Sequence, residues 1–318
     1  MSLRSFVARC AGAPRDLGFD QGQAFAERVR AELRVRVPLD ERIRARLPAS
    51  RERRVWRDLG RYFPHHAERL LGLATGARLA PRTLAPPLVK LLEGDGALSL
   101  AAMVEGEGAL LGRSLPADLP WAVRHSAPET GYRSVELAPL WSVAAAIGVN
   151  EHGLAAMATS LAPPVMTLAG CAAPAALLVQ DVLQRFDTAE KATEWALHRP
   201  AGGDASLVLA DASGVLGGVR IEGRVRRRLE PEGGLLLGLA APERRASLEK
   251  AAAGIQRIDA ESLARSLAGA SGEETSIAVA DPLGRRLGLA RVDGIEWHAV
   301  DGERSSDARA ASDAVARS

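Results

Sequence analysis

The chain has 318 residues, with 41 Lys and Arg against 39 Asp and Glu and a hydrophobic fraction of 47%. A net charge of +2 provides no electrostatic footprint for nucleic acid, and the apolar fraction suffices for a folded core. Since no apolar stretch reaches the length of a signal-peptide core or a membrane span, we expect a cytoplasmic protein without a membrane partner. Cys10 and Cys171 are far apart in sequence, so we expect buried thiols, no metal and no cofactor.

The first part of the chain has the pattern of helices. Apolar residues recur at a four-residue step within residues 15–37, which predicts an amphipathic helix. These residues are Phe25, Val29, Leu33 and Val37. A second helix is predicted over residues 51–73, with a break at Pro64, and the proline-rich residues 79–87 are predicted to be a connector.

From residue 98 onward, strands in hairpins precede a helix pair and further strands. The predicted strands are residues 98–104, 109–115, 143–149, 154–159, 206–210, 215–221, 235–240, 276–280, 287–292 and 295–300. The predicted helices are residues 174–186, 188–198, 243–253 and 260–268. The basic run at residues 224–228 is typical of a hairpin arm at a sheet edge. This order predicts an α+β fold of two antiparallel sheets with helices outside them, in a single domain over residues 1–300 with a flexible tail at 301–318.

Six segments of the chain resemble, in order, the penicillin acyltransferase (acyl-coenzyme A:6-aminopenicillanic-acid acyltransferase, peptidase C45-like) family of Ntn hydrolases. Gly-Ala-Pro-Arg-Asp-Leu-Gly at residues 12–18 is similar to that family's opening pattern, and the match continues to the glycine at 22. The other segments are residues 63–76, 108–113, 148–154, 209–214 and 281–282. Together they cover the chain from about residue 12 to residue 300, so the resemblance implies a four-layer αββα sandwich.

The resemblance also implies a reaction. Members of the family cut their own chain before a cysteine, which then acts as nucleophile with its own α-amino group as base. The family's Asp-Gly-Cys-Thr corresponds here to Asp95-Gly96-Ala97-Leu98, so Ala97 occupies the nucleophile position. A methyl group can neither attack a carbonyl carbon nor begin the acyl shift of self-cleavage.

Other functional positions of the family differ in the same direction. The family's Asn and Asp that follow the Gly-Arg pair correspond to Ser114 and Pro116, and the Asn expected at the oxyanion site falls near Ala240. Three further residues match the family and are candidate pocket residues, although each can equally be a turn or scaffold residue. They are Arg113, Asn150 and Glu222.

Three functional hypotheses follow. The first is a non-catalytic, unprocessed homologue that binds a small amide or acyl ligand or a protein partner, a second copy included. The second is an active amide hydrolase or acyltransferase in which Ser99 becomes the N-terminal nucleophile after cleavage behind Leu98. Ser99 lies two residues downstream of the family position, a shift of roughly 6–7 Å along a strand. The third is a scaffold subunit whose pocket has closed and whose function is confined to assembly.

The histidines offer no recognised motif. Adjacent His65 and His66 are expected to point to different sides of a helix, which argues against a shared metal ion. His125, His152 and His198 are single, and we expect them on the surface or in turns.

Overall fold

The structure is a computed structural model. It describes residues 6–37, 51–91, 96–104, 108–116, 119–161, 173–238, 240, 242–253, 258–271, 275–291 and 293–301. Cys171 and the predicted tail beyond residue 301 therefore lie outside the described residues, and the single-domain assignment stays a prediction. None of the helices in the described ranges is long and apolar enough to cross a bilayer.

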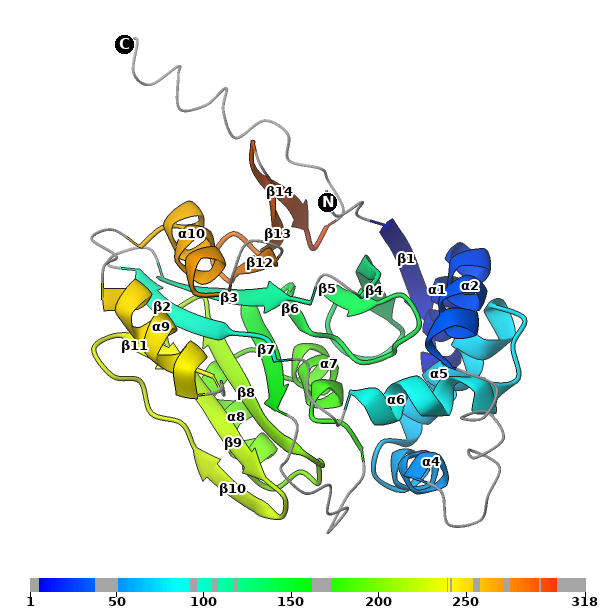
Figure 1. Cartoon of the computed structure of the whole chain (residues 1–318). Helices are drawn as coiled ribbons and strands as arrows, with labels where there is room; N and C mark the ends of the chain where they lie inside the picture. Colours follow the sequence, from blue (N-terminus) through cyan, green and yellow to red (C-terminus); the bar gives the residue numbers. More distant parts are fainter. Residues whose placement is uncertain are drawn as a thin grey trace.

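Two sheets form the centre of the molecule (Figure 1). The eight-stranded sheet contains, in spatial order, β1 (Phe6–Gly12), β4 (Trp121–Pro128), β5 (Ser134–Pro139), β6 (Ile147–Asn150), β7 (Leu154–Leu161), β8 (Asp204–Asp211), β9 (Leu216–Glu222) and β10 (Val225–Arg228). The six-stranded sheet contains β11 (Leu235–Leu237), β2 (Ser99–Val104), β3 (Gly108–Leu115), β12 (Ser276–Asp281), β13 (Arg286–Arg291) and β14 (Gly294–Ala299). β1 pairs with β4 in parallel, and the other pairs among these strands are antiparallel.

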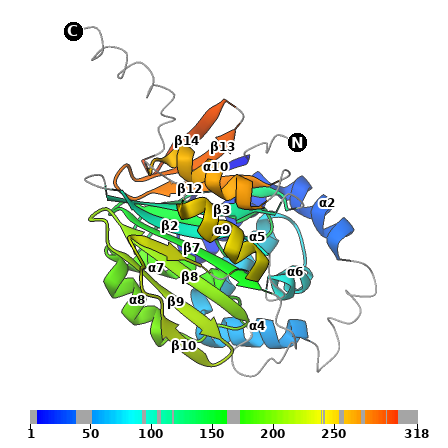
Figure 2. The same cartoon turned by 60° about the vertical axis from the view of Figure 1, so that its left-hand side comes forward.

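Helices cover the outer face of each sheet (Figures 1 and 2). Those on the eight-stranded sheet are α1 (Pro14–Ala24), α2 (Ala26–Arg36), α4 (Arg51–Tyr62), α5 (Pro64–Gly76), the 3₁₀ turn η1 (Pro81–Leu84), α6 (Ala85–Lys90), α7 (Ala176–Arg185) and α8 (Ala189–Leu197). Those on the six-stranded sheet are α9 (Pro242–Ala253) and α10 (Ala260–Ser271). The predicted α+β fold, with two sheets flanked by helices, is confirmed.

Side chains alternate between the two faces of each strand, as the pleat requires. Along β7, Ala155 and Met157 face the six-stranded sheet, whereas Leu154 and Ala156 face the helices. By the same alternation, Thr159 faces the six-stranded sheet. Polar residues on this inward face therefore lie between the two sheets.

Several predicted boundaries were wrong for identifiable reasons. The helix predicted over residues 15–37 is two helices, because Phe25 leaves helical geometry at φ −118° and ψ 16° while its ring stays buried. The connector predicted at residues 79–87 contains η1 and the start of α6, since proline is tolerated in the first turn of a helix. Strands β1, β4 and β5 were missed, because buried Ala8 and Cys10 in β1 and the polar residues of β4 obscure the alternation.

Other predictions were confirmed. The break at Pro64 separates α4 from α5. The helix predicted over residues 188–198 is α8, and its N-cap residue Thr188 accepts a hydrogen bond from the amide of Lys191. The thiol of Cys10 is buried. The basic run forms β10, which is an edge strand of the eight-stranded sheet.

Helices α1 and α5 cross at backbone contact distance. Their interface is made by four glycines at a four-residue step, namely Gly18 and Gly22 on α1 and Gly72 and Gly76 on α5. A Cβ on Gly18 would lie 1.8 Å from the carbonyl oxygen of Arg69, and a Cβ on Gly72 would lie 1.9 Å from that of Arg15. This crossing holds the middle and end of α5 against α1.

Candidate functional site

The nucleophile position of the resembled family lies immediately before β2. Ala97 is buried, with 3% of its surface exposed. The backbone on either side of it is tied to two strands, because the Gly96 amide donates to the carbonyl of Ser160 (3.4 Å) and the Leu98 amide donates to Ser114 Oγ (2.7 Å). The Gly96 carbonyl accepts a 2.6 Å hydrogen bond from Nη1 of Arg244. Ala97 therefore sits at the seam where β2, β3 and the end of β7 meet.

Three buried hydroxyl groups, those of Ser99, Thr159 and Ser206, lie between the sheets next to Ala97. Since Ala101 belongs to the inter-sheet core, alternation places Ala97 and Ser99 on the same inward face. Ser99 Oγ lies 3.2 Å from Thr159 Oγ1, which lies 2.9 Å from Ser206 Oγ. The hydroxyls link β2 to β7 and β8 across the sandwich.

The backbone at Gly238, just beyond β11, covers the Ser99 hydroxyl. The Gly238 amide donates to the Ser99 carbonyl at 3.0 Å, and a Cβ on Gly238 would lie 1.8 Å from Ser99 Oγ. Ser99 also occupies a ladder position opposite Arg113 in the β2–β3 pair. Hydroxyl groups such as that of Thr159 are poor general bases, so these contacts hold Ser99 without activating it.

Arg113 joins the two sheets next to this seam. It is buried, its Nε donates to the carbonyl of Ala158 at 2.8 Å, and its Nη1 donates to the carbonyl of Ser114 at 3.3 Å. Pro116 follows the end of β3 and is half-buried. Ala240 packs instead with Leu98 on the side of α9 and α10.

The other two candidate pocket residues lie elsewhere. Asn150 ends β6, where its Nδ2 donates to the carbonyls of Leu183 and Phe186 while its Oδ1 accepts from the amides of His152 and Leu154. That position is at the far end of β7 from the seam, roughly 20 Å along the strand. Glu222 ends β9, 42% exposed, and its Oε1 pairs with Nε of Arg220 at 3.1 Å. The structure brings Arg113 and Ser114 to Ala97 but not Asn150.

One small cavity adjoins the seam. A cavity of about 20 Å³ touches Thr159, Ser160 and Ala205. A volume of that size holds about one water molecule.

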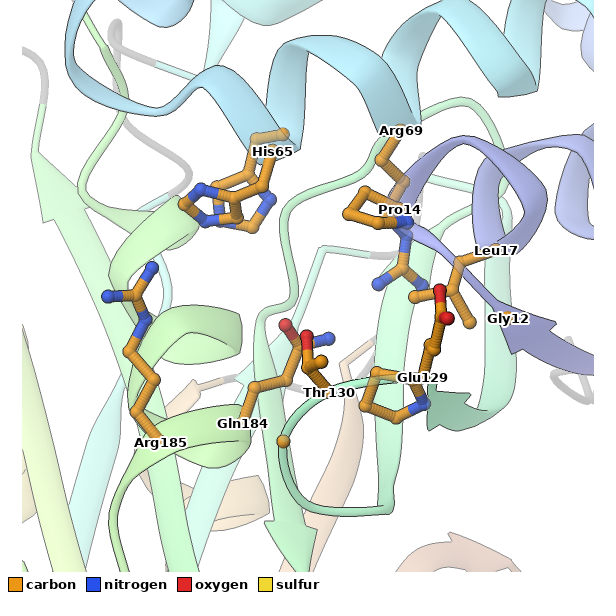
Figure 3. Close-up of a pocket in the computed structure, with 12 residues that line it drawn as sticks. Gly12, Pro14, Leu17, His65, Arg69, Glu129, Thr130, Gln184 and Arg185 are labelled. Atoms are coloured by element: carbon orange, nitrogen blue, oxygen red, sulfur yellow. The ribbon is translucent and has the colours of Figure 1, made fainter.

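A larger pocket of about 300 Å³ opens between α1, α5, α7 and residues 128–131 (Figure 3). In the close-up, Arg69 from α5 and Arg185 from α7 approach it from opposite sides, with Glu129 and Thr130 between them. Its other polar lining residues are His65, His66 and Gln184. The sequence patterns did not predict this pocket, because they contain no sign that α5 and α7 meet.

His65 and His66 both contact Asp181 of α7. The Nε2 of His65 forms a short contact with Asp181 Oδ1, and the Nε2 of His66 lies 3.3 Å from the same oxygen. The expectation that these histidines face different sides of the helix was wrong, because one carboxylate lies within reach of both rings. His66 is also buried rather than on the surface, with 1% exposed.

Burial and hydrogen bonding set the charges in this cluster. Burial lowers the pKa of His66 to about 4, so its imidazole is neutral at pH 7. Burial by itself would raise the pKa of Asp181, but the close contacts with the rings of His65 and His66 outweigh it and hold that pKa well below its usual range. Asp181 is therefore ionised in the folded protein.

Arg69 borders both the pocket and a buried polar network. Its Nη2 donates to Ser126 Oγ at 3.2 Å, whereas its Nε and Nη1 are buried without a hydrogen-bond partner. Burial lowers the pKa of Arg69 to about 10, which leaves it charged at pH 7. The network beneath it contains the fully buried pair Arg124–Glu136, whose Nη2 and Oε2 are 2.6 Å apart. Arg69 and Arg124 thus place two buried positive charges near the single buried carboxylate of Glu136.

The remaining histidines occupy two kinds of environment. His152 lies in a turn and His198 is exposed at the end of α8, as predicted. His125 is half-buried within β4, and its ring centroid is 6.3 Å from that of His298. The surface or turn position predicted for His125 was wrong, because β4 itself was not recognised.

No family model matches the sequence, and neither does any curated protein sequence. Solved structures do resemble the fold. An N-acylethanolamine-hydrolyzing acid amidase orthologue from Caenorhabditis elegans is 11% identical, with a TM-score of 0.50 over 58% of this chain and 93% of its own. A mutant conjugated bile acid hydrolase from Clostridium perfringens is 14% identical, with a TM-score of 0.46 over 65% of this chain and 94% of its own. Penicillin V acylase from Agrobacterium tumefaciens is 15% identical, with a TM-score of 0.37 over 65% and 79%. The chain has the Ntn-hydrolase fold.

Proposed function

We propose that this protein is a non-catalytic, C45-like member of the Ntn-hydrolase superfamily, kept as one unprocessed chain, that acts by binding a small amide or acyl ligand or a partner protein. The observation that carries the proposal is the methyl group of Ala97, buried at the start of β2 where the resembled family has its nucleophile. Without a thiol or hydroxyl at that atom, neither self-cleavage nor acyl transfer has a first step. The buried thiol of Cys10 fits the cytoplasm as its compartment.

The surroundings of Ser99 support this proposal over a serine hydrolase. Cleavage before Ser99 requires attack on the carbonyl of Leu98, and this carbonyl accepts a 2.9 Å hydrogen bond from the amide of Ser114 within the sheet. The attacking hydroxyl is itself buried and hydrogen-bonded to Thr159. Nucleophilic catalysis depends on geometry before chemistry, and both groups are held in structural contacts.

The altered positions around the seam agree with a lost reaction. Ser114 Oγ accepts a hydrogen bond from the amide of Leu98, and Pro116 has no polar side chain. Ala240 contributes a methyl group to the apolar cluster between the six-stranded sheet and helices α9 and α10. Arg113 remains, and its hydrogen bond to Ala158 is structural. A binding or scaffold role needs none of the missing groups.

A hydrolysis panel tests the proposal. Purified protein is incubated with an N-acylethanolamine, a conjugated bile acid and penicillin V, the compounds that the similar structures are named for. We expect product formation indistinguishable from that of Ser99→Ala, because the chain has no activated nucleophile. The measurement is product release followed by chromatography over hours at pH 5 and pH 7.

The Ser99→Ala variant is a usable control, because loss of one buried hydrogen bond costs only about 1 kcal/mol of stability. Its folding is checked by circular dichroism. Hydrolysis of any of the three compounds by the wild type, lost in Ser99→Ala, would establish the serine hydrolase instead.

A further inference from the structure

The cluster of His65, His66 and Asp181 has the geometry of a metal-ligand set. One ligand atom from each residue can be chosen so that all three lie within 4.8 Å of one another. The Nε2 of His66 and Oδ1 of Asp181 are 3.3 Å apart. Two ligands at about 2.0–2.1 Å from a tetrahedral zinc ion are separated by roughly 3.3 Å. The spacing of His66 and Asp181 therefore suits a shared ion, and the His65 ring lies close enough to complete the set.

Three buried atoms of the cluster lack hydrogen-bond partners. Both ring nitrogens of His66 and the Oδ2 of Asp181 are inaccessible to solvent and form no hydrogen bond of acceptable geometry. Asp181 is 0% exposed, and His66 is 1% exposed. Buried polar side chains normally have partners, and an ion would supply one to both residues.

We propose that His65, His66 and Asp181 bind a zinc ion, with the fourth coordination position open to the pocket. Two imidazoles and one carboxylate are a ligand set that zinc accepts at sites that keep an open position. The helices hold the ligands in place, because α5 provides both histidines in its first turn and α7 provides Asp181 opposite them. This inference concerns a different part of the fold from the Ala97 seam and does not depend on the proposed function.

One cation competes for the same carboxylate. Nη2 of Arg185 lies 3.8 Å from Asp181 Oδ1, but the Arg185 side chain is 45% exposed on the rim of the pocket. A long exposed side chain can turn toward solvent with little loss of contact, which leaves Asp181 for the metal.

Arg69, one turn beyond the two histidines on α5, indicates what fills the fourth position. Arg69 aims a buried guanidinium at the pocket with Nε and Nη1 unpartnered. Together with Arg124 it places two buried positive charges against the single carboxylate of Glu136. A carboxylate ligand would bind the metal and offset this excess charge, since guanidinium and carboxylate match in geometry.

Equilibrium dialysis tests the site directly. Protein treated with EDTA is dialysed against zinc sulfate, and bound metal is measured by inductively coupled plasma mass spectrometry. We expect one zinc ion per wild-type chain and a higher melting temperature when it is bound. His65→Ala should weaken binding by more than about tenfold, because even second-shell changes cost about 10–100-fold. His65 is partly exposed, with 23% of its side chain accessible, so this variant leaves the core intact.

His198→Ala, a change to an exposed histidine outside the cluster, is the matched control and should bind zinc like the wild type. Cobalt substituted for zinc provides a second readout, namely the intense visible absorption of a four-coordinate ion, which acetate should shift. Failure of the wild type to bind zinc, or equal binding by His65→Ala, overturns the metal site. A cobalt spectrum that acetate leaves unchanged overturns the carboxylate ligand.

Discussion

Gly18→Ala is expected to lower the free energy of unfolding by about 3 kcal/mol, at the upper end of what overpacking costs. The added methyl would lie 1.8 Å from the carbonyl oxygen of Arg69 and 2.8 Å from the amide nitrogen of Leu73. These atoms belong to the backbone of α5, so no side chain can rotate away to make room. The two helices must separate, and the contacts that place α5 over the pocket weaken with them. Urea denaturation followed by circular dichroism measures the change.

Gly60→Ala is the matched control for this prediction. Gly60 lies within α4, and a Cβ there meets nothing within 4 Å. Replacing a helical glycine by alanine, where the new methyl group meets no neighbour, should stabilise the protein by about 0.5–1 kcal/mol. A Gly18→Ala variant as stable as the wild type would mean that α1 and α5 do not cross at this distance.

Arg124→Met is expected to cost about 3–5 kcal/mol, because it removes the guanidinium that is hydrogen-bonded to a buried carboxylate. Arg124 and Glu136 are both 0% exposed, and the Arg124 guanidinium also donates to Gln21 Oε1 and to the carbonyl of Ser142. Methionine fills much of the volume but donates no hydrogen bond. The same urea titration measures the loss.

A surface ion pair provides the comparison for Arg124. Arg133 and Glu151 are joined at 2.7 Å, but the Arg133 side chain is 53% exposed. Arg133→Met should therefore change stability by no more than about 1 kcal/mol. Equal effects of the two substitutions would contradict the burial of the Arg124–Glu136 pair.

The sequence predicted strands well where a run of residues is mostly apolar. The hairpin of β2 and β3 was found because most of its residues are apolar, whereas β4 was missed because Arg124 and Ser126 lie buried within it. The sequence pattern does not show the break of the first helix at Phe25, because the Phe25 ring remains on the buried face and keeps the apolar periodicity. Periodicity reports burial, and it cannot show where the backbone changes direction.

The Ala97 seam could be predicted from the sequence, whereas the pocket beside His65 could not. Ala97 was found because the residues around it keep a recognisable order along one strand and its neighbour. The pocket was not, because Asp181 is 116 residues from His65 and meets it through the packing of α5 against α7. The geometry of a single helix argues against a shared partner for His65 and His66. Their shared partner, Asp181, comes from a second helix, α7.

Intact mass spectrometry of the purified protein tests the central claim most directly. If Ala97 has abolished self-cleavage and Ser99 does not replace it, the chain is a single species of 33.5 kDa at any time after synthesis. Two fragments, the second beginning with Ser99 or Ala97, would contradict the account and show that the seam still carries out its own cleavage.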